Sequence, residues 1–449
     1  DFPVIYRSCR QGIATMEPQE PGKNMRPLFE MIKREIPGPT GESELPLQLQ
    51  IATLDYDDYV GRIGIGRIKN GIIEAGQMIT LCKRDGSSEQ LKIGKLWVYK
   101  GLKRTEVQSA SAGEIVALSG LNQVNIGETV CCLENPLPLP LLSIDEPTLT
   151  MTFMVNDSPF AGREGKYVTS RHIRNRLWKE AETNVSLKVE ETPSPDAFQV
   201  SGRGELHLSI LIETMRREGY ELQISKPEPI TKEIDGKLYE PYERLFIFVS
   251  EEFSGQVLEN LGRRRAELTN MQTSDTNQVK MEFLIPARGL IGFRSEFLTD
   301  TKGDGVMHHL FDSYGPWKDG IETRNQGSLV AFENGEASSY GIHNVEDRGT
   351  LFVSPGEKVY TGMVVGIHVR DEDLDVNVCK KKHLTNMRSS SADEAIRLTP
   401  PVIFSLEQAM EFINDDELVE VTPSSIRIRK KTLDRAERAR SRKKNEYSA

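Results

Sequence analysis

Lysine and arginine side chains without an acidic neighbour fill one short stretch in the last quarter of the chain. The stretch opens with Lys380-Lys381-Lys382-His383 and continues through Asn386 to Arg388. It shows neither a helical nor a strand period, and the serine run that follows it is typical of an exposed loop. Lysine supplies a mobile charge and arginine a planar fork, and both suit the phosphate oxygens of an RNA backbone. These residues predict a phosphate-binding loop, although an ordinary solvated loop has a similar composition.

A second basic stretch lies near the C-terminus, at Ile426-Arg427-Ile428-Arg429-Lys430-Lys431. Side chains alternate between the two faces of a strand, so we expect both isoleucines on a core and both arginines on the opposite, outward face. We therefore expect an edge strand that presents a basic stripe, with Arg427, Arg429, Lys430 and Lys431 contacting RNA. From Arg427 to Lys444 there are ten Lys or Arg against two acids. Such a block is typical of an interaction tail, and equally of a solvated helix end.

Residues for nucleotide hydrolysis or metal binding do not occur at the spacing that such chemistry needs. The sequence has no G-x-x-x-x-G-K-[ST] string, and the nearest stretch, Gly162 to Tyr167, lacks the Ser/Thr that would bind magnesium. The histidines, including His207 and the pair His308-His309, have no Cys or carboxylate at ligand spacing. Five scattered cysteines without C-x-x-C spacing fit a reducing compartment. We expect no catalytic residue and no metal site in this chain.

Composition sets the broad class of the protein. The chain has 449 residues, of which 37% are hydrophobic and 28% charged, and its formal net charge is -10. No apolar run approaches the roughly 18 residues that a membrane span needs, so we expect no membrane partner. The acidic net charge excludes a uniformly basic nucleic-acid binder, and RNA binding must therefore be local to the basic stretches.

Turn signals and apolar periods divide the chain into segments, and we expect a multidomain α+β fold. Alternating residues with glycine turns at Gly71, Gly76 and Gly86 predict a small β-barrel. A helical period from Glu205 to Glu218, stopped by Gly219, belongs to the first of two β-α-β-β-α-β units of the ferredoxin-like kind. The expected segments are a terminal strand and helix of a further domain at 1–38, a linker at 39–46, the β-barrel at 47–141, ferredoxin-like sandwiches at 146–228 and 240–314, and a mixed, mainly-β C-terminal domain with a basic tail at 315–449.

Several strings resemble translational GTPases. SGRGELHLSILIETMRREGY at 201–220 is similar to the third domain of elongation factor G, GRIGIGRIKNGIIEAGQ at 61–77 to the second-domain barrel, and PARGLIGFRSEF at 286–297 to the fifth domain. The strings KKKHLTNMRSSSADEA and FINDDELVEVTPSSIRIRKK resemble the C-terminal domain peculiar to the BipA/TypA branch. About a dozen residues separate the two sandwiches, too few for the domain that elongation factor G inserts there.

The resemblance implies the C-terminal part of a ribosome-associated GTPase whose G domain would precede residue 1. This chain is then not expected to hydrolyse GTP and needs no cofactor, whereas the intact parent would use GTP and magnesium. The family's partners are the ribosome, through large-subunit rRNA and ribosomal proteins, and an A-site tRNA, whose acceptor end the loop from Lys380 to Arg388 would contact. The implied role is translation, large-subunit assembly or a stress response, in the cytoplasm or an organelle stroma.

Two further points follow from the resemblance. Ser8 and Cys9 stand where the family places a Ser-Ala pair beside the guanine base, and the cysteine departs from that pattern. Two alternatives also stay open. One is an autonomous RNA-binding accessory protein, and the other is a sister factor of the LepA or elongation factor G type.

Overall fold

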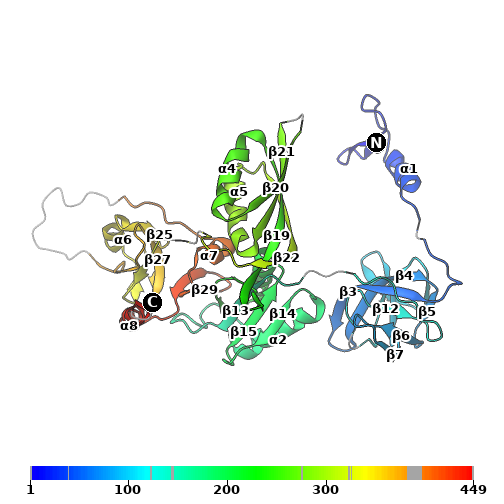
Figure 1. The fold of residues 1–449 in the computed structure, drawn as a ribbon, viewed down its shortest axis with the longest axis horizontal. Helices are drawn as coiled ribbons and strands as arrows, with labels where there is room; N and C mark the ends of the chain where they lie inside the picture. Colours follow the sequence, from blue (N-terminus) through cyan, green and yellow to red (C-terminus); the bar gives the residue numbers. More distant parts are fainter. Residues whose placement is uncertain are drawn as a thin grey trace, which may run out of the picture. The chain divides into compact units, whose positions relative to one another are not determined.

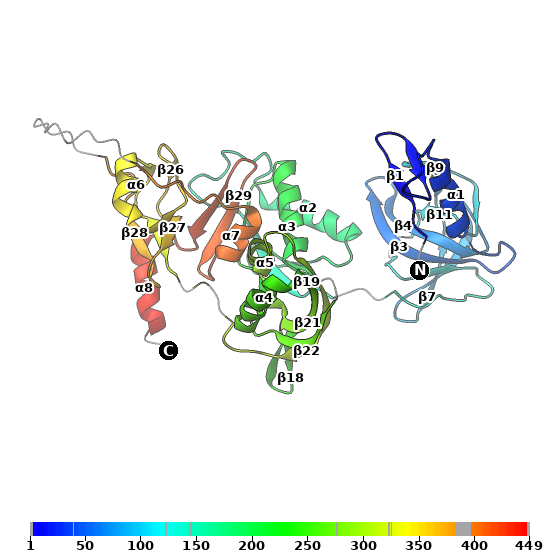
Figure 2. The same cartoon turned by 90° about the horizontal axis from the view of Figure 1, so that it is seen from above.

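The computed structural model describes residues 3–38, 40–121, 124–142, 146–274, 277–321, 324, 326–381 and 397–446. The protein is a multidomain α+β chain that forms two compact units (Figures 1 and 2). One unit contains Asp1–Ser143 with Glu182–Val185, and the other contains Ile144–Ala181 with Ser186–Ala449.

The first unit is built around a β-barrel-like core. Its strands are β3 (Gln48–Asp57), β4 (Gly61–Asn70), β5 (Ile72–Glu74), β6 (Met78–Cys82), β7 (Ser88–Lys92), β8 (Leu96–Lys100), β9 (Lys103–Glu106), β10 (Ser109–Ser111), β11 (Ile115–Leu118) and β12 (Thr129–Cys131). The main sheet has the order β7-β6-β12-β3-β4-β11-β8-β9, and inward side chains such as Leu49, Ile68 and Val116 are fully buried. The predicted turn glycines Gly71, Gly76 and Gly86 all have positive φ, which a side chain would oppose.

The N-terminal residues differ from the expectation. In place of the single terminal strand expected within residues 1–38, β1 (Tyr6–Ser8) pairs with β2 (Ile13–Thr15) in a short hairpin. Helix α1 (Arg26–Glu35) buries none of its residues, and Phe29 is 62% exposed. None of the described apolar side chains in this segment belongs to one of the hydrophobic cores.

The second unit begins with a β-α-β-β-α-β segment. Its elements are β13 (Leu149–Val155), α2 (Ser170–Thr183), β14 (Lys188–Glu191), β15 (Ala197–Gly202), α3 (Glu205–Glu218) and β16 (Leu222–Ile224), followed by β17 (Glu228–Pro229). The sheet order β14-β15-β13-β16 is that of the split β-α-β arrangement. Helix α3 ends at Gly219 in the left-handed conformation, as its sequence predicts. Leu208, Ile212 and Met215 on α3 pack against the sheet.

A second segment has the same topology. It consists of β18 (Lys232–Ile234), β19 (Lys237–Ser250), α4 (Glu251–Arg263), β20 (Glu267–Thr273), β21 (Gln278–Pro286), a 3-10 turn at Ala287–Leu290, α5 (Phe293–Asp300) and β22 (Val306–Pro316). Strands β22, β19, β21 and β20 lie side by side in that order. Helices α4 and α5 cover one face of this sheet (Figure 1), with Val257, Leu261 and Phe297 in the core between them.

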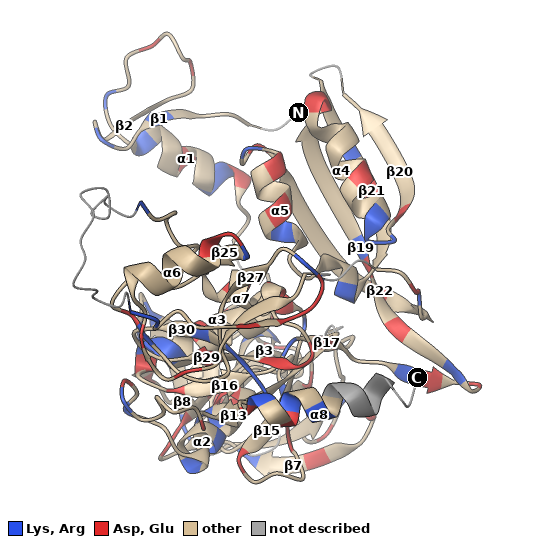
Figure 3. Cartoon of the chain, turned by 90° about the vertical axis from the view of Figure 1, so that its left-hand side faces the viewer, with Lys and Arg blue, Asp and Glu red and all other residues tan. Residues whose placement is uncertain are grey.

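The remaining elements complete the second unit. They are β23 (Ser328–Ala331), β24 (Gly335–Glu336), α6 (Ser339–Glu346), β25 (Gly349–Leu351), β26 (Lys358–Val359), β27 (Met363–His368), β28 (Leu374–Val376), α7 (Leu406–Phe412), β29 (Glu417–Val421), β30 (Ile426–Lys430) and α8 (Arg435–Glu446). Helix α7 begins with a capping box of Ser405 and Gln408. Helix α8 carries basic residues on its first turns (Figure 3).

One sheet joins the first segment of this unit to the last. Strand β29 pairs with β16, so the strand order continues β14-β15-β13-β16-β29-β30-β27-β23-β28. Residues of α7, β29 and β30 such as Met410, Val419 and Ile428 share a core with the β13–β16 segment, whereas β23–β28 and α6 enclose a separate core. The β29–β30 hairpin thereby covers β16, which would otherwise be an exposed edge strand.

Candidate nucleic-acid interface

The first two residues of the predicted phosphate-binding loop are exposed. Lys380 and Lys381 follow β28 by four and five positions, and neither has an ion-pair partner among the residues that the structure describes. The turn before them is fixed, because Asn377 Oδ1 accepts from the Cys379 amide at 2.9 Å and the Lys380 carbonyl accepts from Ser338 Oγ at 2.5 Å. The other predicted contacts, Lys382, His383, Asn386 and Arg388, lie outside the described residues.

The second basic stretch is not an edge strand, and this prediction was wrong. Strand β30 lies between β29 and β27 in the interior of the joined sheet. The side chain of Arg427 is 11% exposed, that of Arg429 3% and that of Lys430 2%. Only Lys431 is exposed as expected.

The three cations are bound by carboxylates, of which Asp157 and Glu164 come from a distant part of the sequence. Arg427 pairs with Glu420 at 2.9 Å and with Glu164. Arg429 pairs with Asp157 at 2.6 Å, and its guanidinium also donates to the carbonyls of Lys430 and Lys431. A guanidinium with its donors occupied in this way does not offer them to an RNA phosphate.

Lys430 has three acidic neighbours. Its Nζ lies 2.7 Å from Asp373, 2.9 Å from Asp416 and 3.0 Å from Glu417. Burial opposes the charge on Lys430, but the three carboxylates raise its pKa above the usual value. Burial likewise opposes the charge on Glu417, whose pKa is nevertheless lowered by Lys430 and Arg324. This cluster is a structural ion-pair network, in which each charge depends on its partners.

A buried polar network links the β13–β16 segment to the C-terminal hairpin. Glu420 is fully buried, and it accepts hydrogen bonds from Asn156, Arg427 and the Tyr360 hydroxyl. Burial is the largest cause that raises the pKa of Tyr360, and the charge of Glu420 is the next. The phenol therefore stays protonated and can donate its hydrogen. Asn156 also donates to Glu221, another fully buried carboxylate. Because every member has a partner, the network fixes how the hairpin sits on β16.

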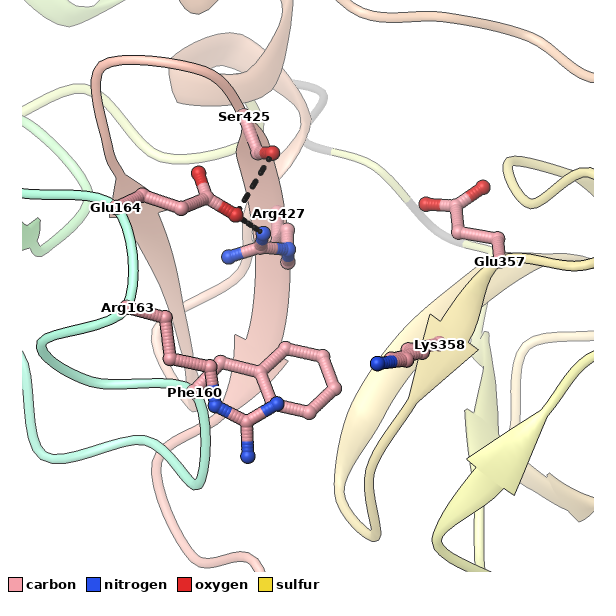
Figure 4. Close-up of a pocket in the computed structure, with 7 residues that line it drawn as sticks. All are labelled: Phe160, Arg163, Glu164, Glu357, Lys358, Ser425 and Arg427. Atoms are coloured by element: carbon pink, nitrogen blue, oxygen red, sulfur yellow. Dashed lines mark hydrogen bonds and ion pairs between the residues drawn. The ribbon is translucent and has the colours of Figure 1, made fainter.

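A pocket of about 300 Å³ lies next to Arg427 (Figure 4). The Arg163 guanidinium lies 4.4 Å from the Phe160 ring centroid on one wall, and Lys358 and Glu357 come from the other. The Glu164 carboxylate in this pocket is taken up by Arg427, Thr422 and Ser425. Two of the three cations that line it, Arg163 and Lys358, face solvent and add positive charge beside the hairpin.

The residues expected near a guanine base sit in the N-terminal hairpin. Ser8 ends β1 and Cys9 is exposed in the turn that follows. Their carbonyls accept from the amides of Gln11 and Gly12. Nucleotide binding by Ser8 and Cys9 stays a prediction.

Sequence spacing missed two carboxylate contacts in the second unit. His309 lies inside β22, where it pairs with the nearly buried Glu243 of β19 across the sheet. Farther along, the Gly292 amide before α5 donates to Glu205 of α3 at 3.0 Å. Glu411 of α7 packs so closely on Gly292 that a Cβ there would displace the Glu411 carboxyl. Burial, and then Glu205, raise the pKa of Glu411 to about 7, and burial raises that of Glu205. Only the folded chain brings α3, α5 and α7 together, so no local signal pointed to this site.

The described residues show neither a metal-ligand cluster nor a membrane-spanning helix. Within them, no group of three or more His, Cys, Asp or Glu is placed to hold a metal ion. None of the helices that can be described is both long and apolar enough to cross a membrane.

Comparison with known proteins identifies the modules. Residues 61–131 match elongation factor Tu domain 2, residues 237–325 match the elongation factor G C-terminus, and residues 326–435 match the TypA/BipA C-terminal domain. The first two matches define a set of translational GTPase modules. None of the three matched domains is the one that hydrolyses GTP.

Individual relatives match along nearly the whole chain. The large ribosomal subunit assembly factor BipA of Bacillus subtilis (strain 168) is 53% identical over 445 residues, which is 99% of this chain and 73% of that protein. The proteins of the same name from Synechocystis and Haemophilus influenzae are 53% and 51% identical, over 96% and 98% of this chain and 72% of each relative. The chain belongs to the BipA/TypA family, which decides against the LepA and elongation factor G alternatives.

Proposed function

We propose that this chain is the ribosome-docking part of a BipA/TypA factor that acts in large-subunit assembly, translation or a stress response. The observation that carries the proposal is the 53% identity over 99% of the chain to a protein named as a large ribosomal subunit assembly factor. GTP and magnesium would act in a G domain that the matched segments do not include. The partners are large-subunit rRNA, ribosomal proteins and an A-site tRNA, in the cytoplasm.

Within this function, the loop that opens at Lys380 binds RNA phosphate near the acceptor end of the tRNA. The exposure of Lys380 and Lys381 supports this role, as does the lack of a described carboxylate partner for either. Lys431 is the only member of the second basic stretch that remains available. Arg427, Arg429 and Lys430 hold the hairpin in place and are withdrawn from the RNA-binding set.

Replacing Lys380 and Lys381 together by alanine tests the loop. Each phosphate contact contributes about 0.9 to the log-log slope of affinity against salt, so the double variant should reduce the slope of ribosome binding by up to about two units. The free energy of unfolding should stay within about 0.5 kcal/mol of the parent, because both side chains are exposed. The measurement is sedimentation with large subunits from 50 to 200 mM salt.

The matched control is the double variant Lys380→Arg and Lys381→Arg, which keeps both charges and should keep the parent's slope. An alanine variant that melts normally and binds large subunits with unchanged affinity and slope would exclude this loop. Lys431 and the first turn of α8 would then be the next basic residues to test.

A further inference from the structure

Strands β22, β19, β21 and β20 form a sheet with one face that none of the described helices covers. Core residues of β19, such as Leu245 and Ile247, point toward α4 and α5, so the alternate residues Phe246 and Phe248 point away. Phe248 is 42% exposed, and Leu310 on the neighbouring β22 is 47% exposed. Phe246 is partly exposed at the centre of this face.

The strand register places rings and cations next to one another on the open face. Phe246 stands opposite His308, and the two rings are nearly parallel, with an interplanar angle of 21° and centroids 6.3 Å apart. Lys280 on β21 stands opposite Phe248, and its Nζ lies 5.9 Å from the Phe248 ring and 6.0 Å from the Phe246 ring. The face thus combines flat aromatic surfaces with a cation held beside them.

The acids of this face are already engaged. Glu282 pairs with Lys280 at 3.1 Å, and Asp312 pairs with Arg244 at 2.6 Å. Both pairs are partly exposed, so they are weak and either cation can exchange its carboxylate for a phosphate. Neither of these two described carboxylates is therefore left unpaired to repel an RNA strand.

We propose that this open face is a stacking platform for unpaired bases of RNA. One class of RNA-binding module stacks unpaired bases on the exposed aromatic rings of a four-stranded sheet, and strands β22, β19, β21 and β20, with exposed rings on β19, offer the same kind of surface. Here the rings are Phe246 and Phe248 on β19, with Lys280 and Arg244 placed for the phosphates. The third strand of the segment, β21, has no aromatic residue on this face, so the platform accommodates one or two bases.

The inference rests on the proposed function, because a chain that docks on ribosomes meets unpaired rRNA and tRNA bases. It nevertheless concerns a different surface from the Lys380 loop and a different kind of contact. Stacking depends on the ring and not on charge, so removing a ring should lower affinity equally at every salt concentration. The slope of affinity against salt should then stay as in the parent, in contrast to the lysine variant above.

The experiment uses the full chain with a fluorescent 12-nucleotide unstructured RNA and, separately, the same sequence as a duplex. Phe246→Leu keeps an apolar side chain but removes the ring, and should weaken binding of the single strand about five- to hundredfold. Phe246→Tyr keeps the ring and should bind as the parent does. Leu310→Ala, on the same face without a ring, should change affinity less than twofold, and the duplex should bind more weakly than the single strand.

Two results would overturn the proposal. One is single-strand binding that is unaffected by Phe246→Leu in a variant that melts like the parent. The other is a loss of ribosome binding in both Phe246→Leu and Leu310→Ala without any change in RNA affinity, which would assign the face to a protein partner. Phe248→Leu serves as the second ring variant if Phe246→Leu unfolds. If these results exclude the stacking platform while the alanine variant of Lys380 and Lys381 still lowers the salt slope of ribosome binding, the proposed function stands.

Discussion

Lys430→Met is expected to destabilise the second unit by about 3–5 kcal/mol, while Lys431→Met changes its stability by less than about 0.5 kcal/mol. The two lysines are adjacent in sequence, but Lys430 is 2% exposed among three carboxylates and Lys431 is exposed. Removing the first cation leaves Glu417, which is fully buried, with Arg324 as its remaining charged partner. The measurement is urea unfolding at pH 7, with hydrogen exchange of β29 and β30 to locate the loss.

The pH dependence of this difference has a definite sign. The pKa of Glu417 is lowered in the folded parent, so ionised Glu417 contributes to the free energy of unfolding at pH values above its unfolded pKa, near 4.5. This contribution is lost as the pH falls through the folded pKa. In the variant, Glu417 can take up a proton at low pH, which removes the uncompensated negative charge. The difference in the free energy of unfolding between the parent and Lys430→Met should therefore decrease from pH 7 to pH 4. The contrary result is a Lys430→Met variant that is as stable as the parent at pH 7 and has a salt slope of ribosome binding lower by about one unit. That result would make Lys430 an RNA contact.

The sequence predicted elements whose signals are local. Helix α3 follows from the period of Leu208, Leu211 and Ile212, and Gly219 marks its end because the left-handed cap needs a residue without a side chain. The capping box at Ser405 is equally local, since both of its hydrogen bonds span three residues. Each of these features depends on residues within one or two turns of chain.

The sequence failed where two distant segments meet. Alternation correctly separates Ile428 from Arg427 and Arg429, but it does not say what covers the arginine side. Glu164 and Asp157, more than 260 positions upstream, supply that cover once β29 pairs with β16. The residues of the predicted basic stripe form a buried ion-pair network instead, because non-local strand pairing places β30 inside a sheet. His309 is a second case, because its carboxylate partner lies 66 positions away on β19.

Glu411→Gln is expected to stabilise the second unit at pH 8 and to leave its stability nearly unchanged at pH 5. The Glu411 carboxyl of α7 packs on Gly292 and faces Glu205 from α3 and Glu296 from α5, with Arg264 as the nearby cation. Burial and the neighbouring Glu205 raise its pKa to about 7. The charged form is therefore unfavourable where α3, α5 and α7 meet.

The sign follows from proton binding in the two states. Between the unfolded value of 4.5 and the folded value of about 7, the folded protein holds a proton that the unfolded chain has lost, so stability falls as pH rises through this interval. A shift of this size corresponds to about 3 kcal/mol, and because Glu411 is partly exposed, solvent screening reduces the expected effect to about 1–2 kcal/mol. Glutamine does not ionise and should remove that slope.

Parent and variant are compared by urea unfolding at pH 5, 6, 7 and 8, with hydrogen exchange of α7 as the local probe. Glu407→Gln, a neighbouring acid on the same helix whose side chain is not packed on Gly292, is the control and should keep most of the parent's slope. Equal pH profiles for the parent and Glu411→Gln would show that the carboxyl at Gly292 does not titrate in this interval, and the contact among α3, α5 and α7 would then be independent of pH.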